Sequence, residues 1–290
     1  MINKNDILKA FEGSIALNLK IMEEHYNLRS LVVEPPSGSP FFLLNDLSES
    51  ISLHLPVDRV IGRSALINKS WDIGKQKFIS EVTRLNKTPL TLIDIGANVG
   101  LFSRQCLSSI CNIESAYLFE PHPFNYDLLM KNFSGMKKIS LNNFALGPAS
   151  GILNFYLDGE NAGNYSLNKN AMPLNFKEIS VPVLSANEQI NIIFNSNPGN
   201  KFIYKSDTQG YDELISTSIS LDFWDCVCCA IFELWRIRDK NYSQDDFIKV
   251  LDKFKYKAFE KNPTKQVSAN DVIQYLDSED KRYDDLLLWN

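Results

Sequence analysis

The sequence of 290 residues lacks a long hydrophobic run, an excess of positive charge and a regular set of cysteines. Its longest unbroken apolar stretch runs only from Cys226 to Phe232, whereas a membrane-spanning helix needs about 20 apolar residues, so we expect no transmembrane segment. The first residues carry Asn, Asp and Glu where a secretory signal would need an apolar core. This pattern predicts a cytoplasmic protein.

Basic residues are slightly outnumbered, because 30 Lys and Arg stand against 35 Asp and Glu, for a formal net charge of -5. A nucleic-acid partner would need a concentrated positive face, so we expect no nucleic acid to bind. The 44% hydrophobic content is ordinary for a globular protein. The length allows one large α/β domain with an extension, or two smaller domains.

The five cysteines do not fit a disulfide framework, because their number is odd and three of them lie within Cys226–Cys229. We therefore expect reduced thiols. A structural zinc site needs four ligands, and the remaining cysteines, Cys106 and Cys111, lie in or just after a helical pattern far away in sequence. The three histidines also form no metal-binding motif: His25, His54 and His122.

The pattern of apolar and polar residues changes near residue 70. Before that point, an amphipathic pattern predicts one helix over Asn5–Glu24, Glu34–Pro40 interrupts regular structure, and short apolar pieces follow. Residues 1–70 are thus predicted to form a helical and short-strand extension, either a lid or an oligomer contact. Residues 71–290 are predicted to form one domain.

From residue 71 onward, apolar runs typical of buried strands alternate with helical patterns. This alternation predicts an α/β fold with a mostly parallel, doubly wound sheet and helices on both faces. The expected strands are Thr91–Ile95, Ser115–Phe119, Ile139–Asn143, Phe202–Lys205 and Val227–Phe232. The expected helices are about Lys75–Leu85, Val99–Leu107, Pro123–Phe133, Tyr211–Ser216 and Gln244–Phe254. Two further elements are an antiparallel insertion, Gly151–Leu157 with Ile179–Leu184, and a last edge strand, Asp284–Trp289.

The segment Thr91–Leu107 runs from a buried strand through a glycine-rich turn into a helix. Its DxGxNxG pattern consists of Asp94, Gly96, Asn98 and Gly100. Glycine permits a sharp turn and a close approach of a ligand to the backbone, and asparagine tolerates left-handed angles. A dinucleotide fingerprint would place its third glycine at position 101, which is Leu101 here. An acid at position 94 suits a ligand that carries an ammonium group, which favours S-adenosylmethionine.

A second acid, Glu120, closes the next strand and follows Gly100 by 20 residues. At this spacing a carboxylate can hold the two hydroxyls of a ribose. Together with the glycines, Glu120 favours cofactor binding over a simple strand-end turn. His122 lies beside the expected adenosine, either as a contact or as a solvated loop residue. Phe144 and Ala145 follow the third strand, where adenine would be sandwiched, although Phe144 could equally belong to the core.

With these motifs the chain resembles the FkbM-type S-adenosylmethionine-dependent methyltransferases. The resemblance spans about Trp71–Leu288 and rests on Ile93–Gly100, Phe119–Pro123, Phe144–Gly147 and Lys205–Leu214. It implies a Rossmann-like class I methyltransferase fold, a seven-stranded sheet whose last strand is antiparallel, and O-methylation of hydroxyls on sugars, glycans or natural products. It also implies an acid two residues after the glycine of the last segment, where Asp212 is followed by Glu213.

Two acids are expected at the carboxyl ends of neighbouring strands, where ligands of open α/β sheets bind. Asp207 follows the strand FIYK, and Glu233 closes the strand CCAIF. In one mechanism, Asp207 is the general base, while Lys205 or Glu233 positions the acceptor. In the other, Asp207 and Glu233, with Asp212, hold a Mg²⁺ ion that binds the acceptor oxygens. The alternative interpretation is structural: Asp207 caps a turn and Glu233 pairs with a neighbouring arginine.

The polar segment Asp158–Leu167 is expected to overhang the cofactor cleft. Its Asn164, Tyr165 and Ser166 are predicted contacts of a polyhydroxylated acceptor, unless the segment is a surface loop without a role. Two other function classes stay open, an NAD(P)-dependent oxidoreductase and a noncatalytic cofactor-binding or scaffold protein. The glycine spacing and the lack of a TyrxxxLys motif argue against the oxidoreductase, and Asp207 argues against the scaffold.

Overall fold

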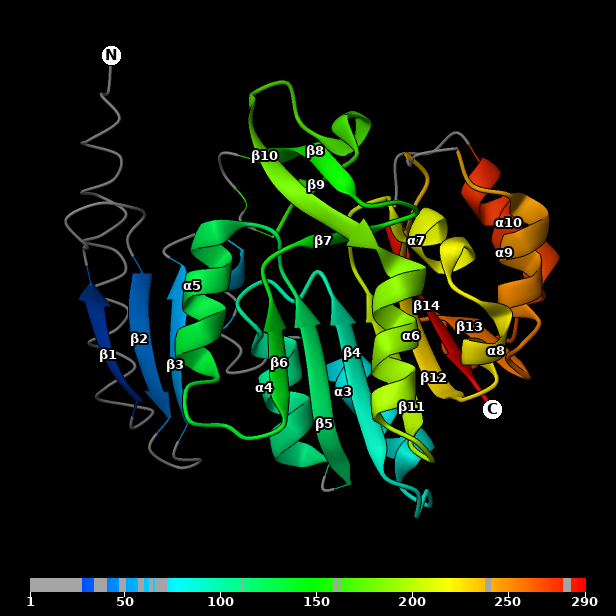
Figure 1. Cartoon of the computed structure of the whole chain (residues 1–290), viewed down its shortest axis with the longest axis horizontal. Helices are drawn as coiled ribbons and strands as arrows, with labels where there is room; N and C mark the ends of the chain where they lie inside the picture. The colour runs from blue at the N-terminus through cyan, green and yellow to red at the C-terminus, as the bar shows by residue number, and fades with distance from the viewer. Residues whose placement is uncertain are drawn as a thin grey trace. The chain divides into compact units, whose positions relative to one another are not determined.

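Figure 1 shows the computed structural model of the chain, which describes residues 28–33, 41–46, 51–56, 60–62, 65, 72–110, 112–158, 161, 163–237, 241–278 and 283–290. The chain forms two compact units, residues 1–57 and 58–290. The helix predicted over Asn5–Glu24 lies outside the described residues. The boundary at residue 70 and the role of the extension as a lid or an oligomer contact stay predictions.

The N-terminal unit contains a three-stranded antiparallel sheet. Its strands are β1 (Leu28–Val33), β2 (Phe41–Asp46) and β3 (Ile51–Pro56), and β2 pairs with both neighbours. Consecutive strands pair with one another, so the sheet is a simple meander with β2 in the middle.

The larger unit is built on a seven-stranded sheet in the order β13-β14-β12-β11-β4-β5-β6. Its strands are β4 (Leu90–Ile95), β5 (Ile113–Phe119), β6 (Ile139–Asn142), β11 (Lys201–Ser206), β12 (Val227–Trp235), β13 (Tyr256–Phe259) and β14 (Tyr283–Trp289). The five strands from β6 to β12 are parallel, and β14 is antiparallel to both of its neighbours. The predicted Rossmann-like class I methyltransferase fold, with its antiparallel last strand, is confirmed.

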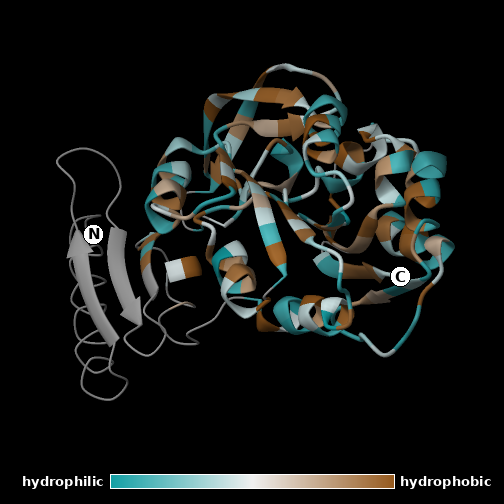
Figure 2. Cartoon of the chain, turned by 60° about the horizontal axis from the view of Figure 1, so that its bottom comes forward, coloured by the Kyte–Doolittle hydropathy of each residue, from teal (hydrophilic) through white to brown (hydrophobic). Residues whose placement is uncertain are grey.

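Helices cover both faces of this sheet, as predicted. One face packs against α3 (Ile73–Thr83), α4 (Leu101–Ser109) and α5 (Pro123–Asn132). The other packs against α6 (Ala186–Ser196), α7 (Asp212–Ser218), α8 (Leu221–Trp224), α9 (Gln244–Leu251) and α10 (Ala269–Asp277). The helices carry hydrophobic and hydrophilic stretches side by side (Figure 2), whereas β4 is buried along its whole length. None of the described helices is long and apolar enough to cross a membrane.

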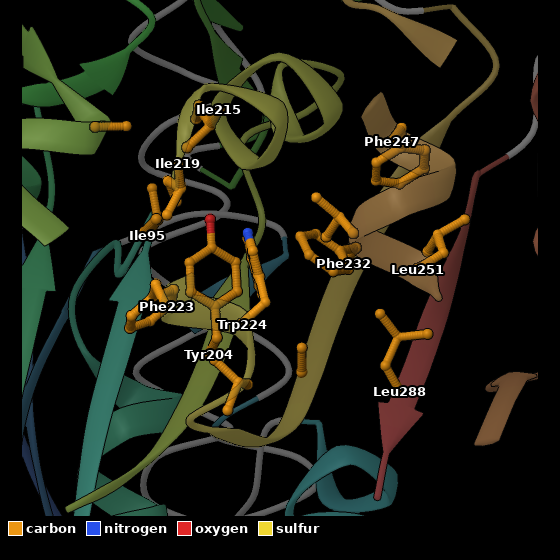
Figure 3. Close-up of a cluster of buried hydrophobic side chains, with 14 of the residues drawn as sticks. Ile95, Tyr204, Ile215, Ile219, Phe223, Trp224, Phe232, Phe247, Leu251 and Leu288 are labelled. Atoms are coloured by element: carbon orange, nitrogen blue, oxygen red, sulfur yellow. The ribbon is translucent and has the colours of Figure 1, made fainter. Parts of the chain in front are cut away.

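An aromatic cluster packs helices α8 and α9 against the middle of the sheet (Figure 3). The ring centroid of Tyr204 on β11 lies 4.9 Å from that of Trp224 and 5.4 Å from that of Phe232 on β12. Phe232 in turn lies 6.1 Å from Phe247 on α9 in an edge-to-face arrangement. Because all four rings are buried, the cluster holds the carboxyl ends of β11 and β12 in a fixed position.

A smaller four-stranded sheet lies beyond the carboxyl ends of β4, β5 and β6 (Figure 1). It consists of β7 (Ala145–Gly147), β8 (Gly151–Asp158), β9 (Tyr165–Ser166) and β10 (Phe176–Ser185). The long strands β8 and β10 are antiparallel, so the predicted antiparallel insertion is confirmed. The insertion brings β9 to the edge at which ligands of parallel sheets bind.

The sheet differs from the sequence prediction at one edge. The strand predicted to be the edge, β14, is second from the edge, because β13 pairs along its outer side. Neither β13 nor α6, α8 and α10 was anticipated. The strand β13 has only four residues with Lys257 among them, so it is too short for a clear periodic pattern. The helix α6 follows β10 without a loop, although its buried Ala186, Ile190 and Ile193 recur at helical spacing.

Replacement of Phe232 by alanine tests the aromatic cluster. We expect Phe232→Ala to lower the free energy of unfolding by about 3–5 kcal/mol, because the large buried ring leaves a cavity that rigid neighbours cannot fill. Leu174→Ala is the control, since that side chain is fully exposed (100%) and its loss should change stability by less than about 0.5 kcal/mol. Urea unfolding of both variants provides the measurement, and similar losses in the two would contradict the packing described.

Candidate functional site

A cleft of about 880 Å³, including its open mouth, lies at the carboxyl ends of β4, β5 and β11. The order of strands along the chain reverses between β4 and β11, and ligands of open α/β sheets bind at such a switch point. Most of the predicted cofactor residues line the cleft: Gly96, Asn98, Glu120, Phe144 and Ala145.

The glycine-rich turn owes its shape to three left-handed residues. Gly96 has φ +76°, and a Cβ atom there would collide with the backbone carbonyl of Asp207. Gly100 has φ +78° and begins α4, where a Cβ atom would meet the ring of Phe133. Asn98 also adopts a left-handed angle, φ +52°, as predicted for asparagine in this pattern. The turn can therefore pack directly against the loop that follows β11.

Glu120 points its carboxylate into the cleft from the end of β5. It is buried and accepts hydrogen bonds from two backbone groups, the N–H of Asn98 and the N–H of His122, both at 2.8 Å. Burial raises the pKa of Glu120 to about 7, and the two N–H donors only partly oppose this shift. A carboxylate offers about four acceptor positions, so two remain for hydroxyl donors in the cleft.

An apolar wall continues from Glu120. Phe144 and Ala145 both line the cleft, and the ring of Phe144 lies 5.6 Å from that of Phe119 in edge-to-face geometry. Phe144 also packs against the core, and its predicted contact with adenine stays a prediction. The two side chains give this side of the cleft an apolar lining.

Residues 163–167, here called the roof, lie over the cleft and include β9. Gly163, Tyr165 and Leu167 line the cleft. The ring of Tyr165 lies 4.7 Å from the ring of His122. His122 does not line the cleft. Its side chain is half-buried and caps α5 by accepting a hydrogen bond from the N–H of Asn125.

The other two predicted acceptor residues have structural contacts in the roof. The hydroxyl of Ser166 is buried 2.9 Å from the carbonyl oxygen of Gln209 and 3.1 Å from that of Thr208, so it fastens the roof to the loop after β11. The side-chain amide of Asn164 donates to Asp158 at 2.9 Å. Neither residue lines the cleft, and Tyr165 is the one of the three that does.

Lys205 lies between two carboxylates at the end of β11. Its ammonium group is 3.0 Å from Asp94 Oδ1 and 3.6 Å from Asp207 Oδ2, and these two acids keep the pKa of Lys205 above its ordinary value although burial opposes them. Asp94 is fully buried and also accepts from the hydroxyl of Ser103 at 2.5 Å. Asp94 does not line the cleft, and its predicted contact with a cofactor ammonium group stays a prediction.

Asp207 and Glu233 are brought together through Gln209, as expected for neighbouring strand ends. The side-chain amide nitrogen of Gln209 donates to Asp207 Oδ1 at 2.7 Å and to Glu233 Oε2. Asp207 lines the cleft, whereas Glu233 lies behind Gln209 and also accepts from the indole N–H of Trp235 at 2.7 Å. Burial raises the pKa of Asp207, but Lys205 and Lys75 outweigh it, so the net pKa lies below the ordinary value. Asp207 is therefore anionic.

The predicted magnesium site does not form from these side chains. Asp212 turns away from Asp207 and accepts from the Ser206 hydroxyl and the backbone N–H of Thr208, so it caps the loop. The amide of Gln209 occupies the position between Asp207 and Glu233 that a cation would need. Within the residues that the structure describes, no three His, Cys, Asp or Glu side chains are grouped as metal ligands. The donor set does not fit Mg²⁺.

Two charged residues of the site were not anticipated. Lys75 on α3 reaches Asp285 on β14 at 2.9 Å, and Asp285 lies directly opposite Glu233 in the pairing of β12 with β14. Gln209 belongs to the Lys205–Leu214 segment, but its bridging position depends on a left-handed angle, φ +57°. No local sequence pattern predicts the ion pair between Lys75 and Asp285, because the two residues are far apart in the chain.

No family model matches the sequence, and no curated protein matches it. Among solved structures, the chain is similar to the FkbM methyltransferase of Methylobacillus flagellatus, with 11% identity, a TM-score of 0.41, and coverage of 69% of this chain and 44% of that one. It is also similar to the spermidine synthase of Thermotoga maritima, with 8% identity, a TM-score of 0.36, and coverage of 89% and 71%. A protein of the NADB-Rossmann superfamily from Streptococcus agalactiae matches with 13% identity, a TM-score of 0.35, and coverage of 77% and 71%.

The chain thus spans less than half of the FkbM structure's length, and membership of that family stays a prediction. With TM-scores of 0.41, 0.36 and 0.35, these likenesses carry no argument about chemistry. The chemistry of the cleft follows from its own side chains.

The pKa of Glu120 predicts how ligand affinity depends on pH. Ribose hydroxyls donate to an ionised carboxylate, and the pKa of Glu120, raised to about 7, means that its protonated fraction grows as the pH falls through 7. We expect the affinity for S-adenosylhomocysteine to be constant above that pH and to fall by up to about tenfold per unit below it. Isothermal titration calorimetry between about pH 5.5 and 8 provides the measurement.

The matched control is Glu120→Gln, which cannot titrate. It should bind weakly and without this pH dependence. An affinity of the unaltered protein that stays constant over the same range would show that the Glu120 carboxylate does not hold the ligand.

Proposed function

We propose that the chain is an S-adenosylmethionine-dependent methyltransferase that methylates a hydroxyl group of a sugar, glycan or natural product in the cytoplasm. The observation that carries the proposal is the buried Glu120 carboxylate. It faces the cleft between the Gly96 turn and the apolar wall of Phe144, and an anionic Asp207 lines the same cleft. We assign this function to residues 71–290 and propose that residues 1–70 act as a lid or an oligomer contact.

The residues of the cleft fit S-adenosylmethionine. Glu120 would accept the two ribose hydroxyls, Phe144 and Ala145 would flank the adenine, and Tyr165 would cover the nucleoside from the roof. His122 would support Tyr165 rather than contact the adenosine itself, since its ring packs against Tyr165 and does not line the cleft. When bound, the cofactor supplies an electrophilic methyl group that is activated by a positive sulfonium.

Asp207 is the residue best placed to receive the acceptor's proton. Its side chain is 22% exposed and anionic, so it can accept a hydrogen bond from a hydroxyl in the cleft. A carboxylate is too weak a base to ionise a free alcohol. The acceptor oxygen becomes strongly acidic once its bond to the methyl group is largely formed, and Asp207 can then take the proton late in the transfer. Lys205 and Gln209 hold the Asp207 carboxylate in place, and Glu233 acts through Gln209.

Ligand preference separates this function from that of an oxidoreductase. We expect S-adenosylhomocysteine to bind with a measurable heat in calorimetry and NAD to give none, because position 101 carries Leu101 where a dinucleotide turn has its third glycine. Tight binding of NAD without binding of S-adenosylhomocysteine would end the proposal. Binding of neither would favour a scaffold protein.

Asp207→Asn tests the catalytic assignment. We expect the variant to transfer labelled methyl groups at least about 100-fold more slowly, because general-base catalysis contributes about 10²- to 10⁴-fold. Its affinity for S-adenosylhomocysteine should stay nearly unchanged. Transfer is measured with labelled S-adenosylmethionine on lipopolysaccharide, nucleotide-sugar and small-glycan fractions. Asp222→Asn, at an exposed position on α8, is the control, and full activity of Asp207→Asn would refute the role.

A further inference from the structure

The carboxyl end of the sheet holds more acids than cations. Two buried ammonium groups, Lys75 and Lys205, face the four carboxyl groups of Asp94, Asp207, Glu233 and Asp285, and Lys75 also pairs with the partly exposed Asp72 at 3.1 Å. If all four were ionised, the cluster would carry an excess of negative charge in a region largely shielded from water. Such an excess is costly, and proteins relieve it by binding a proton at one of the acids.

Glu233 is the member of this cluster whose hydrogen-bond donors are neutral. Within the described residues these donors are the amide of Gln209 and the indole N–H of Trp235. Asp94 and Asp207, by contrast, share Lys205, and Asp285 contacts Lys75 at 2.9 Å. A proton on Glu233 also lets its carboxyl group donate a hydrogen bond to Asp207.

Glu233 and Asp285 form a cross-strand pair. They are directly opposite in the register of β12 and β14, and both are buried. Two like charges at such a position repel each other, so only one of the two is readily ionised. The ammonium group of Lys75 contacts Asp285 and therefore stabilises the ionised form of Asp285. The proton is then bound by Glu233.

We propose that Lys75 and Asp285 are positioning residues of the reaction, which keep a proton on Glu233 and thereby keep Asp207 anionic and ready to accept a proton. The placement of the proton follows from the contacts alone. The proposal depends on the proposed function only for the role of Asp207 as the group that accepts the proton. The pair acts from α3 and β14, two elements that contribute no residue to the lining of the cleft.

The charged and titratable groups around the pair come from every element packed against it. They are Asp72 and Lys75 at α3, Asp94 and Lys205 on β4 and β11, Asp207 after β11, Glu260 after β13, and Tyr283 and Asp284 on β14. Burial raises the pKa of Asp285 to about 7 against the attraction of Lys75. Burial, with the charges of Asp207 and Asp285, raises the pKa of Glu233 well above its ordinary value.

Infrared spectroscopy of the ligand-free chain at about pH 8, where Asp285 is mostly ionised, locates the proton. We expect one carbonyl band of a buried protonated carboxyl group, lost in Glu233→Gln and kept in Asp285→Asn. In Lys75→Met a second such band should appear, and it should vanish in Lys75→Met/Asp285→Asn. A band that persists in Glu233→Gln, or a Lys75→Met spectrum identical to the unaltered one, overturns the proposal.

The control is Lys77→Met, an exposed lysine on the same helix, which should leave the spectrum unchanged. If a variant fails to fold, thermal unfolding as a function of pH decides instead. Protons bound with a raised pKa stabilise the folded chain below pH 7, and this contribution is lost as the pH rises. The loss of thermal stability in Lys75→Met should therefore grow above pH 7, and adding Asp285→Asn should reverse it. A deficit that is independent of pH would indicate packing alone.

The catalytic consequence is read from the pH profile of kcat/KM. We expect its acid limb to move to higher pH in Lys75→Met, because Asp207 loses the attraction of a buried ammonium group. Lys75→Met/Asp285→Asn should show the same limb as Lys75→Met, since Asp285 is already protonated at that pH. An unmoved limb would overturn the positioning role. A chain that binds no S-adenosylhomocysteine would instead refute the proposed function and leave the infrared result standing.

Discussion

The ion pair between Lys205 and Asp94 is the interaction on which the cleft depends. The two residues are register partners in the pairing of β11 with β4, at the switch point of the sheet, and both are buried. Either charge alone would be costly in this position, so replacement of one residue leaves an unpaired buried charge and destabilises the fold. The pair orients Lys205 toward Asp207 and holds Asp94 beneath the glycine turn. The loops after β4 and β11 can then pack against each other at Gly96.

The pKa values of the two carboxylates in the cleft are shifted in opposite directions. Glu120 has only neutral N–H donors in hydrogen-bond contact, so burial raises its pKa to about 7. Lys205 and Lys75, in contrast, lower the pKa of Asp207 despite burial. In the proposed function, this difference separates a carboxylate that binds the ligand's hydroxyls from a carboxylate that receives a proton.

The fold could be predicted from the sequence largely because its signals are local. The strand from Thr91 to Ile95 is apolar on both faces, and the DxGxNxG pattern requires left-handed residues at fixed positions. The positions of Glu120 and Asp207 in the cleft followed from strand ends. Asp94 and Asp212 were assigned to ligands, whereas in the structure they accept hydrogen bonds from Lys205, Ser103, Ser206 and Thr208, partners that a sequence does not reveal. The partnership of Lys75 with Asp285 depends on the pairing of β12 with β14, which no local pattern encodes.

The central claim is that one ligand bridges the glycine turn, Glu120 and the Asp207 loop. Amide hydrogen exchange with and without S-adenosylhomocysteine tests this claim most directly, because it requires no knowledge of the acceptor. Our account predicts slower exchange in residues 96–101, 118–122 and 207–211, with α9 unchanged as an internal reference. Protection confined to other segments, or no protection at saturating ligand, would contradict it.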